Sequence, residues 1–196
     1  MRPALRGLID SMEYIGDDEN EIWDLVDENR MPTGKTHRRG DPLPEGALRQ
    51  VIHICIFNKK GQMLIQKRQP WKKAFPGMWD VSVGGSVISG EDSRTAAARE
   101  TKEELGLDID FSHIRPKFTF NYEHGFDDFY LIEQDVDISK LHLQESEVQC
   151  VAWATIYDIH NLQAKKQMVP YAYIDFLFDC RQAKNVFSPP PMRRKR

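Results

Sequence analysis

Hydrophobic residues recur along much of the chain with the period of two that is typical of β-strands. Residues 49–58, RQVIHICIFN, form a run of β-branched and apolar residues, and residues 62–68, QMLIQKR, alternate between apolar and polar. The turn sequence NKKG lies between them, so the pattern predicts a β-hairpin. Further strands are predicted at 79–85 (WDVSVGG), at 117–136 as two strands joined at His124-Gly125, and at 147–155 (EVQCVAWAT).

Three other stretches carry helical signals. The clearest is DSRTAAARETKEELG at 92–106, in which Asp92 is a good N-cap and Gly106 occupies the place of a C′ glycine. A short helix is predicted at IYDIHNL, residues 156–162. The segment YAYIDFLFDCR at 171–181 has an apolar stripe at helical spacing, which predicts a helix packed against the core. That stripe consists of Tyr171, Ile174, Leu177 and Phe178.

The order of these elements indicates the fold class. Strands are followed by one helix, then by strands and finally by helices, which favours an α+β fold with a mixed sheet over an alternating parallel fold. An N-terminal β-hairpin extension is predicted from EIWDLVDE and MPTGKTHR, with its turn around Asn29-Arg30 and RGDPLPEG as the following linker. The expected organisation is a weakly ordered segment at 1–20, the hairpin and linker at 21–48, one domain at 49–182, and a basic proline-rich tail at 183–196.

Composition narrows the classes of function. The 196 residues are 40% hydrophobic and 29% charged, as in a soluble globular protein. The net charge of −3 gives no indication of a nucleic-acid or membrane partner. No apolar run approaches the roughly 18 residues that span a bilayer, and the N-terminus lacks the apolar core of a signal peptide. The three cysteines, Cys55, Cys150 and Cys180, are far apart, so a cytoplasmic protein with reduced thiols is expected rather than a disulfide framework or a zinc site.

The clearest predicted helix carries three acidic residues on one face, because Glu100, Glu103 and Glu104 have i, i+3 and i+4 spacing. Lys102 points roughly 200° away from Glu100, so the cluster is expected to lack a compensating cation on its own face. Arg99 flanks the cluster from four residues before Glu103. Such a charge run is usually a solvated face, but carboxylates are also hard ligands that suit Mg²⁺ or Mn²⁺. The hypothesis is therefore a divalent ion that arrives together with a phosphate-containing substrate.

The residues around this cluster resemble the Nudix box, in which Gly, five residues, Glu, seven residues and Arg-Glu-x-x-Glu-Glu-x-Gly-aliphatic follow one another. The matching positions are Gly85, Glu91, Arg99, Glu100, Glu103, Glu104, Gly106 and Leu107. Thr101 departs from the family pattern, which prefers an aliphatic residue there, and this bears on packing rather than on chemistry. The resemblance implies a Nudix fold, an α/β/α sandwich from about 49 to 181, and hydrolysis of a nucleoside diphosphate linked to another group.

The same resemblance implies roles for individual residues. Glu100, Glu103 and Glu104 would hold Mg²⁺ or Mn²⁺, and the backbone carbonyl of Gly84 would add a ligand. One of the carboxylates would act as general base, with Glu104 or Glu103 as the first candidates. The motif residues with structural roles, at the junction of loop and helix and at the helix end, would be Gly85, Glu91, Arg99 and Gly106.

Several charged residues outside the motif are further candidates. Lys67 and Arg68, with Lys72 and Lys73 beyond them, flank the expected cleft and are candidate phosphate-binding residues, although surface solvation accounts for any one of them equally well. Glu145 and Glu147 are additional candidates for the base, and their simpler interpretation is exposed charge at a strand edge.

The remaining expectations concern histidines, specificity and assembly. His37, His53 and His124 show no paired metal-ligand spacing and are expected to be structural or solvent-facing. Substrate specificity is expected from the loops at 69–77 and 121–128, with a small-molecule diphosphate as the substrate. A homodimer is a further expectation, because dimers are common among the proteins that the chain resembles.

A second resemblance concerns residues 66–86, QKRQPWKKAFPGMWDVSVGGS, which are similar to the isopentenyl-diphosphate isomerases, a branch with the Nudix fold. Isomerases of that type carry a cysteine and, two residues later, a metal-binding histidine, where this chain has Gly84 and Ser86. Cys55 lies in the preceding hairpin, and the Nudix box here is intact. The interpretation is a hydrolase on an isomerase-like scaffold; isomerisation, and a module that binds nucleotide without cleaving it, are the alternatives.

Overall fold

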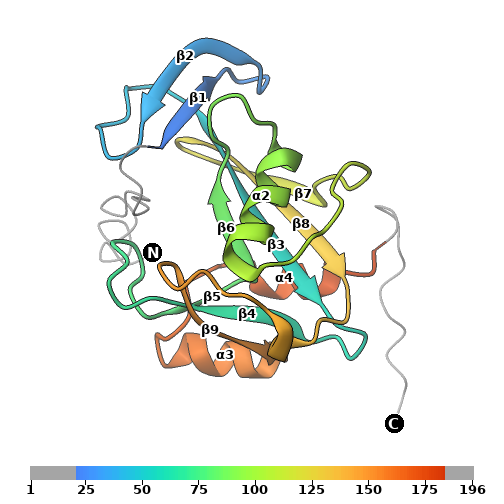
Figure 1. The fold of residues 1–196 in the computed structure, drawn as a ribbon. Coiled ribbons are helices and arrows are strands. Elements are labelled where there is room, and N and C mark those ends of the chain that lie inside the picture. The colour runs from blue at the N-terminus through green and yellow to red at the C-terminus, as the bar shows by residue number, and fades with distance from the viewer. Residues whose placement is uncertain (1–20, 184–196) are drawn as a thin grey trace.

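The computed structural model describes residues 21–183, which form a mixed β-sheet with helices on both faces and a separate N-terminal hairpin (Figure 1). This confirms the predicted α+β class, with a mixed sheet and a hairpin extension. The strands are β1 (Ile22–Val26), β2 (Pro32–Arg38), β3 (Arg49–Phe57), β4 (Met63–Arg68), β5 (Trp79–Asp80), β6 (Val83–Ser86), β7 (Phe118–Tyr122), β8 (Gly125–Glu133) and β9 (Val148–Ala154). The helices are α2 (Ser93–Leu105), the 3-10 helix η2 (Ile138–Lys140), α3 (Ile156–Ala164) and α4 (Ile174–Cys180).

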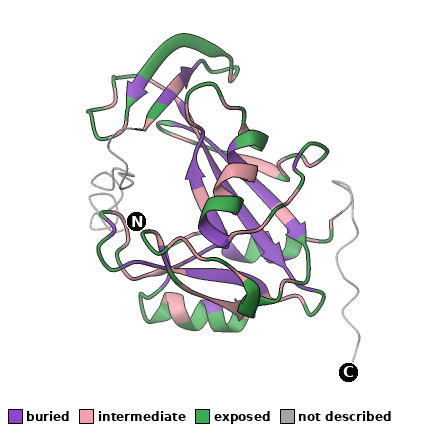
Figure 2. Ribbon diagram, in the orientation of Figure 1, coloured by how far each residue is buried: buried purple, intermediate pink, exposed green. Residues whose placement is uncertain are grey.

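Strand β3 divides the interior into two hydrophobic cores, because successive side chains of a strand point to opposite faces. Ile52, Ile54 and Ile56 pack on the side of α2, whereas Cys55 and Phe57 pack on the side of α3 and α4. The helices complete these cores with Ala96, Ala97 and Leu105 on one side and with Ile159, Ile174, Leu177 and Phe178 on the other. The buried residues accordingly concentrate on the strands β3, β4 and β8 (Figure 2).

The sheet is forked where β3 and β4 meet. The predicted hairpin of these two strands forms, but they pair only at Phe57 and Met63. Beyond that point β3 pairs antiparallel with β6 and parallel with β8, whereas β4 pairs with β5 and β9. The two arms of the fork are therefore β3–β6 and β4–β5.

The single strand predicted at 79–85 is wrong, because the chain crosses from one arm of the fork to the other within it. Asp80 belongs to β5 on β4, and Val83 begins β6 on β3. Between them the Ser82 hydroxyl donates to Leu64 O at 2.5 Å and accepts from Ile56 N at 2.8 Å. One buried side chain thus satisfies backbone groups of both strands at the point where they separate.

The other elements follow the predicted positions closely. Strands β7 and β8 form a hairpin, with Tyr122 opposite Gly125, and α3 begins at a capping box of Thr155 and Asp158. The last helix is shorter than predicted, since Tyr171 precedes α4 instead of belonging to its buried stripe. Within the described part of the chain, none of the helices is both long and apolar enough to cross a membrane. The expectations for 1–20 and for the tail after 183 lie outside the described residues.

Candidate active site

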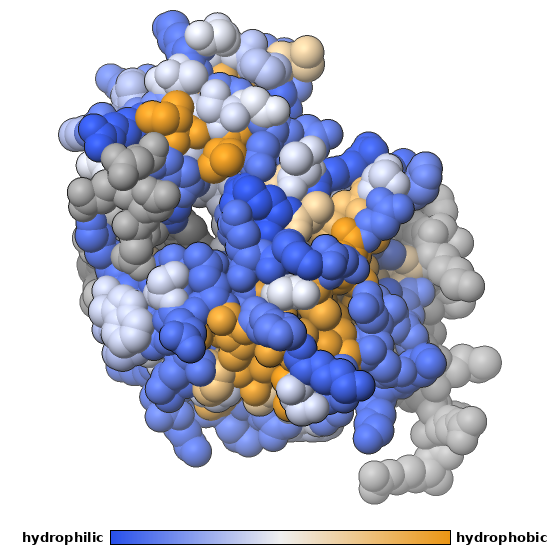
Figure 3. All heavy atoms as spheres, in the orientation of Figure 1, coloured by the Kyte–Doolittle hydropathy of each residue, from blue (hydrophilic) through white to orange (hydrophobic). Residues whose placement is uncertain are grey.

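Helix α2 carries the acidic cluster and has well-defined ends. The Asp92 side chain accepts from Thr95 N at 2.8 Å, and Gly106 adopts the left-handed conformation at φ 68°. A Cβ at position 106 would also lie 2.8 Å from the Cβ of His142, so both the backbone conformation and the lack of space require glycine there. Thr101, which departs from the family pattern, is fully buried and donates to Ala97 O at 2.7 Å. Its hydroxyl is therefore satisfied inside the apolar face of the helix. The outward side of α2 is hydrophilic, whereas hydrophobic residues reach the surface over β4 and β9 (Figure 3).

Arg99 is the centre of the acidic cluster. Its Nε and Nη2 bind both oxygens of Glu91, at 2.8 and 3.0 Å, and Nη2 also donates to Ser86 O at 3.0 Å. Its Nη1 lies 2.9 Å from Glu100 Oε1 and 3.0 Å from Glu103 Oε2. Burial acts to lower the pKa of Arg99, but the ion pairs with Glu91 and Glu100 outweigh it and raise that pKa. The expectation that the cluster lacks a compensating cation is therefore wrong, because Arg99 reaches around the helix to two of the three carboxylates.

Glu100 fills the space that Gly85 leaves open. A Cβ on Gly85 would lie 2.2 Å from Cδ and Oε1 of Glu100, which is far inside any contact distance. Burial raises the pKa of Glu100 to about 7, and the charge of Glu103 adds to this effect, although Arg99 opposes it. The Glu100 carboxyl is thus held against the backbone of β6 in an environment that favours the neutral form.

Glu104 is the most buried member of the cluster, with 5% of its surface exposed. Its Oε2 accepts from Gln66 Nε2 at 2.8 Å, which connects α2 to β4. Burial raises the pKa of Glu104 well above the ordinary range of a carboxyl, and the charge of Glu100 raises it further. Glu103 differs from both, because 47% of its side chain is exposed and its contact is with Arg99.

The two candidate phosphate-binding residues on β4 lie on opposite faces. Leu64 packs in the core beside α2 and Ile65 in the core beside α3, so alternation places Arg68 on the face of Glu104 and Lys67 on the far face. The positive charge of Arg68 acts on Glu104 and lowers its pKa, although burial prevails. Arg68 Nη1 binds Asp80 Oδ2 at 3.1 Å, and Arg68 Nε donates to Ala74 O at 3.1 Å.

The loop at 69–77 is fastened to the segment before β9. Gln69 Nε2 donates to Glu145 O at 2.7 Å, and the buried Lys72 ammonium forms an ion pair with Glu147. Glu147 is also one of the charges that raise the pKa of Glu104. Glu147 is therefore a partly buried neighbour of the acidic cluster instead of an exposed strand-edge charge, whereas the Glu145 side chain is exposed.

The donor set suits a hard divalent cation by its chemistry. Three carboxylates occupy one face of α2, and burial keeps two of them from ionising easily, so a cation beside them would relieve that cost. Gly84 is partly exposed on β6, next to the Gly85 cradle. In the side-chain arrangement of residues 21–183, no three His, Cys, Asp or Glu side chains converge closely enough to hold an ion. Arg99 and Gln66 occupy carboxylate oxygens that a cation would use.

A buried network that the sequence did not reveal lies on the other side of β3. His53 Nδ1 is 2.6 Å from Asp127 Oδ1, and His53 Nε2 is 3.0 Å from the Tyr171 hydroxyl. That hydroxyl donates to Asp80 Oδ1 at 2.6 Å, and Asp80 in turn binds Arg68. Burial acts to lower the pKa of His53, but Asp127 outweighs it and raises that pKa. The network joins the two arms of the fork; the only hint in the sequence was a histidine inside an apolar strand.

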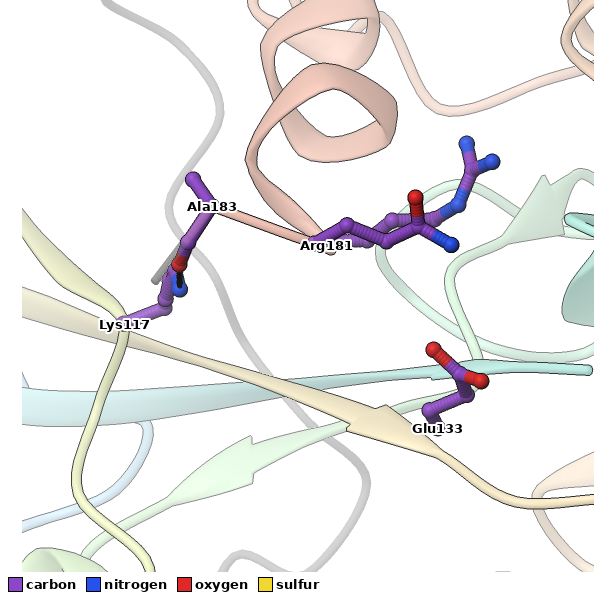
Figure 4. A pocket seen from close by; sticks show the side chains of 5 residues that line it. Lys117, Glu133, Arg181 and Ala183 are labelled. Carbon is purple, nitrogen blue, oxygen red and sulfur yellow. Dashed lines mark hydrogen bonds between the residues drawn. The ribbon is translucent and has the colours of Figure 1, made fainter. Parts of the chain in front are cut away.

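Two cavities lie away from the acidic cluster. One, of about 610 Å³, is lined by Lys117, Glu133 and Arg181 near the end of α4 (Figure 4). The other, of about 340 Å³, lies between β9 and α3 and includes Trp79 and Trp153. Neither is lined by a residue of the Nudix-like motif.

Comparisons with known proteins identify the family. A family model described as the NUDIX domain matches residues 47–174. The chain is 48% identical over 166 residues to "Uncharacterized Nudix hydrolase lin0387" of Listeria innocua, which covers 85% of this chain and 98% of that protein. It is 30% identical over 157 residues to the isopentenyl-diphosphate Delta-isomerase of Streptomyces avermitilis, covering 76% of this chain and 79% of that one. The crystal structure of DR0079 from Deinococcus radiodurans matches with a TM-score of 0.67 and 28% identity, covering 82% of this chain and 99% of that one.

Fold and motif together define an enzyme that hydrolyses phosphorus-containing anhydrides. The chain belongs to the Nudix hydrolase family. Enzymes of this family act on pyrophosphate linkages of small molecules and generally use divalent metals.

Proposed function

We propose that this enzyme hydrolyses the diphosphate linkage of a nucleoside diphosphate derivative or a related organic diphosphate, with Mg²⁺ or Mn²⁺. The observation that carries the proposal is the arrangement of Glu100, Glu103 and Glu104 on one face of α2, with Glu100 pressed against Gly85. These carboxylates and the carbonyl of Gly84 would hold the cation. When bound, the ion supplies charge neutralisation at the diphosphate and acidifies water.

The residues of the chain have distinct roles in this proposal. Arg99, fixed by both oxygens of Glu91, orients Glu100 and Glu103. Glu104 accepts the proton of the attacking water, since it is the most buried carboxylate of the cluster and Gln66 fixes one of its oxygens. Arg68, on the same face as Glu104, attracts the anionic substrate, whereas Lys67 on the far face does not take part.

The surroundings of Cys55 and Ser86 favour hydrolysis over the isomerase alternative. Cys55 is fully buried in the core on the side of α3 and α4, and burial raises the pKa of its thiol well above the ordinary value. It therefore cannot serve as an acid or a base next to α2. The Ser86 hydroxyl, which stands where the isomerases have a histidine, accepts from Arg49 Nη1 at 3.2 Å. A module that binds without cleaving would not need the intact carboxylate set.

The proposal is tested with a panel of nucleoside and non-nucleoside diphosphates, with product masses measured in ¹⁸O-water. Hydrolysis should require Mg²⁺ or Mn²⁺, stop in excess chelator and place one ¹⁸O in a phosphate product. Isopentenyl diphosphate should give no dimethylallyl diphosphate. Full activity in chelator would exclude the metal role, and isomerisation at a rate comparable to hydrolysis would favour the alternative.

The role of Glu104 is tested by Glu104→Gln, which keeps the shape of the side chain and removes its charge. The kcat should fall by about 10²-fold or more, since proton transfer alone contributes roughly 10²–10⁴-fold. Glu103→Gln is the matched variant one residue away. If Glu103→Gln has the larger effect on kcat, the base is Glu103 and the assignment to Glu104 is wrong.

A further inference from the structure

The N-terminal hairpin of β1 and β2 contacts the loop between β6 and α2 directly at one place, and it is connected to the two ends of that loop through Asp128 and Arg49. This loop, residues 87–92, starts beside the Gly85 cradle and contains Glu91, the carboxylate that binds Arg99 through both oxygens. The hairpin lies outside the main sheet, at the end of the molecule where this loop lies (Figure 1). Three serines mark the contacts, namely Ser86 before the loop, Ser89 within it and Ser93 at the start of α2.

The central contact is made by Asp24 of β1. Its Oδ1 accepts from the Ser89 hydroxyl at 2.7 Å, and its Oδ2 accepts from Gly90 N at 2.9 Å. The neighbouring strand backbone adds a third bond, in which Ser89 N donates to Ile22 O at 2.7 Å. Hydrogen bonds to an ionised carboxylate are stronger than neutral ones, so Asp24 restrains the two residues that precede Glu91.

The second contact starts from Arg30 in the turn of the hairpin, where its φ is 65°. Its guanidinium forms an ion pair with Asp128, whose side chain is only 1% exposed, and donates to Thr119 Oγ1 at 3.2 Å. The same carboxylate accepts from the Ser93 hydroxyl at 2.6 Å. Arg30 therefore neutralises the buried charge that holds the first residue of α2.

The third contact is made by Trp23. The guanidinium of Arg49 lies over its ring, 4.2 Å from the centroid, and Arg49 Nη1 donates to the Ser86 hydroxyl at 3.2 Å. Ser86 is the residue whose carbonyl accepts from Arg99. The loop is thus held at both ends and in the middle by side chains that belong to the hairpin or pack on it.

We propose that the hairpin is a positioning element of the active site, and that Asp24 sets the loop that places Glu91 and, through Arg99, the carboxyls of Glu100 and Glu103. This proposal rests on the proposed function for its effect on catalysis, but the geometry it concerns exists without a metal. Asp24 and Arg30 act here as positioning residues, since Asp24 accepts from Ser89 and Gly90 of the loop and Arg30 pairs with Asp128, which in turn accepts from Ser93.

The test compares Asp24→Ala with Asp27→Ala. Asp27 is the matched control, because it belongs to the same hairpin and also accepts two hydrogen bonds, from Asn29 N and Met31 N within the turn. Residue-resolved hydrogen exchange is measured by NMR in chelator. Gly90 loses its acceptor in Asp24→Ala in any case, so the deciding groups are the amides of Ser89 and Glu91 and the Arg99 Nε–H that donates to Glu91.

Asp24→Ala should accelerate exchange at these three groups by about tenfold or more, and Asp27→Ala should leave them unchanged. Mn²⁺ titrations followed by thermal shift should show a half-saturating concentration at least threefold higher for Asp24→Ala than for Asp27→Ala, with a lower kcat and a similar KM.

Unchanged exchange at Ser89, Glu91 and Arg99 would overturn the proposal. Faster exchange with an unchanged Mn²⁺ affinity would overturn the link to the glutamates. A parent protein that binds no Mn²⁺ and hydrolyses no diphosphate would refute the proposed function, while exchange at Arg99 would still decide the positioning role.

Discussion

Gly85 and Glu100 form a contact that only glycine permits, because a Cβ at position 85 would lie 2.2 Å from the Glu100 carboxylate. The group displaced would be the end of a flexible side chain, so Gly85→Ala should change the melting temperature by only a few degrees. The kcat should nevertheless fall by about 10²-fold or more, because a carboxylate that stabilises charge contributes several kcal/mol to the transition state. Enzyme kinetics and thermal unfolding measure both effects. A Gly85→Ala enzyme with more than a third of the parent kcat would show that the position of Glu100 is unimportant.

The Glu100 carboxyl also gives a prediction about how the stability of the protein depends on pH. Its pKa is higher in the folded protein, about 7, than the ordinary value of 4.5, so the folded state binds this proton more tightly than the unfolded state does. Stability should therefore be highest below about pH 4.5 as far as this group is concerned, and its contribution should fall as the pH rises to 7 and beyond. If this contribution of Glu100 is lost completely, the free energy of unfolding falls by about 3 kcal/mol.

Urea unfolding in chelator from pH 5 to 8.5 tests this expectation. The parent should lose stability across the window, and Glu100→Gln should show a flatter profile. Mg²⁺ should restore stability mainly at high pH, since it binds the folded state with the ionised carboxyl. An identical pH profile for the parent and Glu100→Gln would mean that Glu100 ionises normally in the folded protein.

The sequence allowed much of this site to be anticipated, because its motif is local. The spacing of Glu100, Glu103 and Glu104 within one helix determines that they share a face, and the caps at Asp92 and Gly106 depend on neighbouring residues alone. The mixed sheet was likewise predicted from the order of the strands and helices, and the hairpin extension from the turn residues around Asn29-Arg30.

The features that the sequence did not reveal depend on side-chain reach and on long-range pairing. Arg99 was expected only to flank the cluster, yet its long side chain binds both Glu100 and Glu103. Ser82 divides a strand because Ile56 and Leu64 lie on either side of it, which no local pattern indicates. His53 meets Tyr171 over a separation of 118 residues, so their contact becomes visible only in the folded chain.

Arg99 gives the third prediction, which concerns stability. Removal of one partner from a buried ion pair typically costs about 3–5 kcal/mol, because charges remain buried without compensation. The Arg99 side chain is 23% exposed, so Arg99→Ala should cost about 3 kcal/mol in chelator. Mg²⁺ should recover part of the loss. Lys102→Ala is the control on the same helix, since Lys102 pairs with Asp108 at the exposed surface and should cost less than about 1 kcal/mol. Equal effects of the two variants on urea unfolding would contradict the central role of Arg99.

The fourth prediction concerns Tyr171, whose hydroxyl joins the two arms of the fork. It donates to Asp80 on β5 and lies 3.0 Å from His53 Nε2 on β3, so it contacts two buried polar groups at once. Tyr171→Phe keeps the ring and removes both contacts. A buried group that loses its partner costs about 1–3 kcal/mol, and two groups are affected, so a loss of about 2–4 kcal/mol is expected. Tyr157→Phe is the control, because Tyr157 is 77% exposed on α3 and its substitution should cost less than about 0.5 kcal/mol.

Because Asp80 also holds Arg68, which lies on the face of Glu104, Tyr171→Phe should raise KM more than it lowers kcat. Urea unfolding and steady-state kinetics of the two variants measure these effects. A Tyr171→Phe enzyme as stable as Tyr157→Phe would show that the Tyr171 hydroxyl does not hold the two arms together.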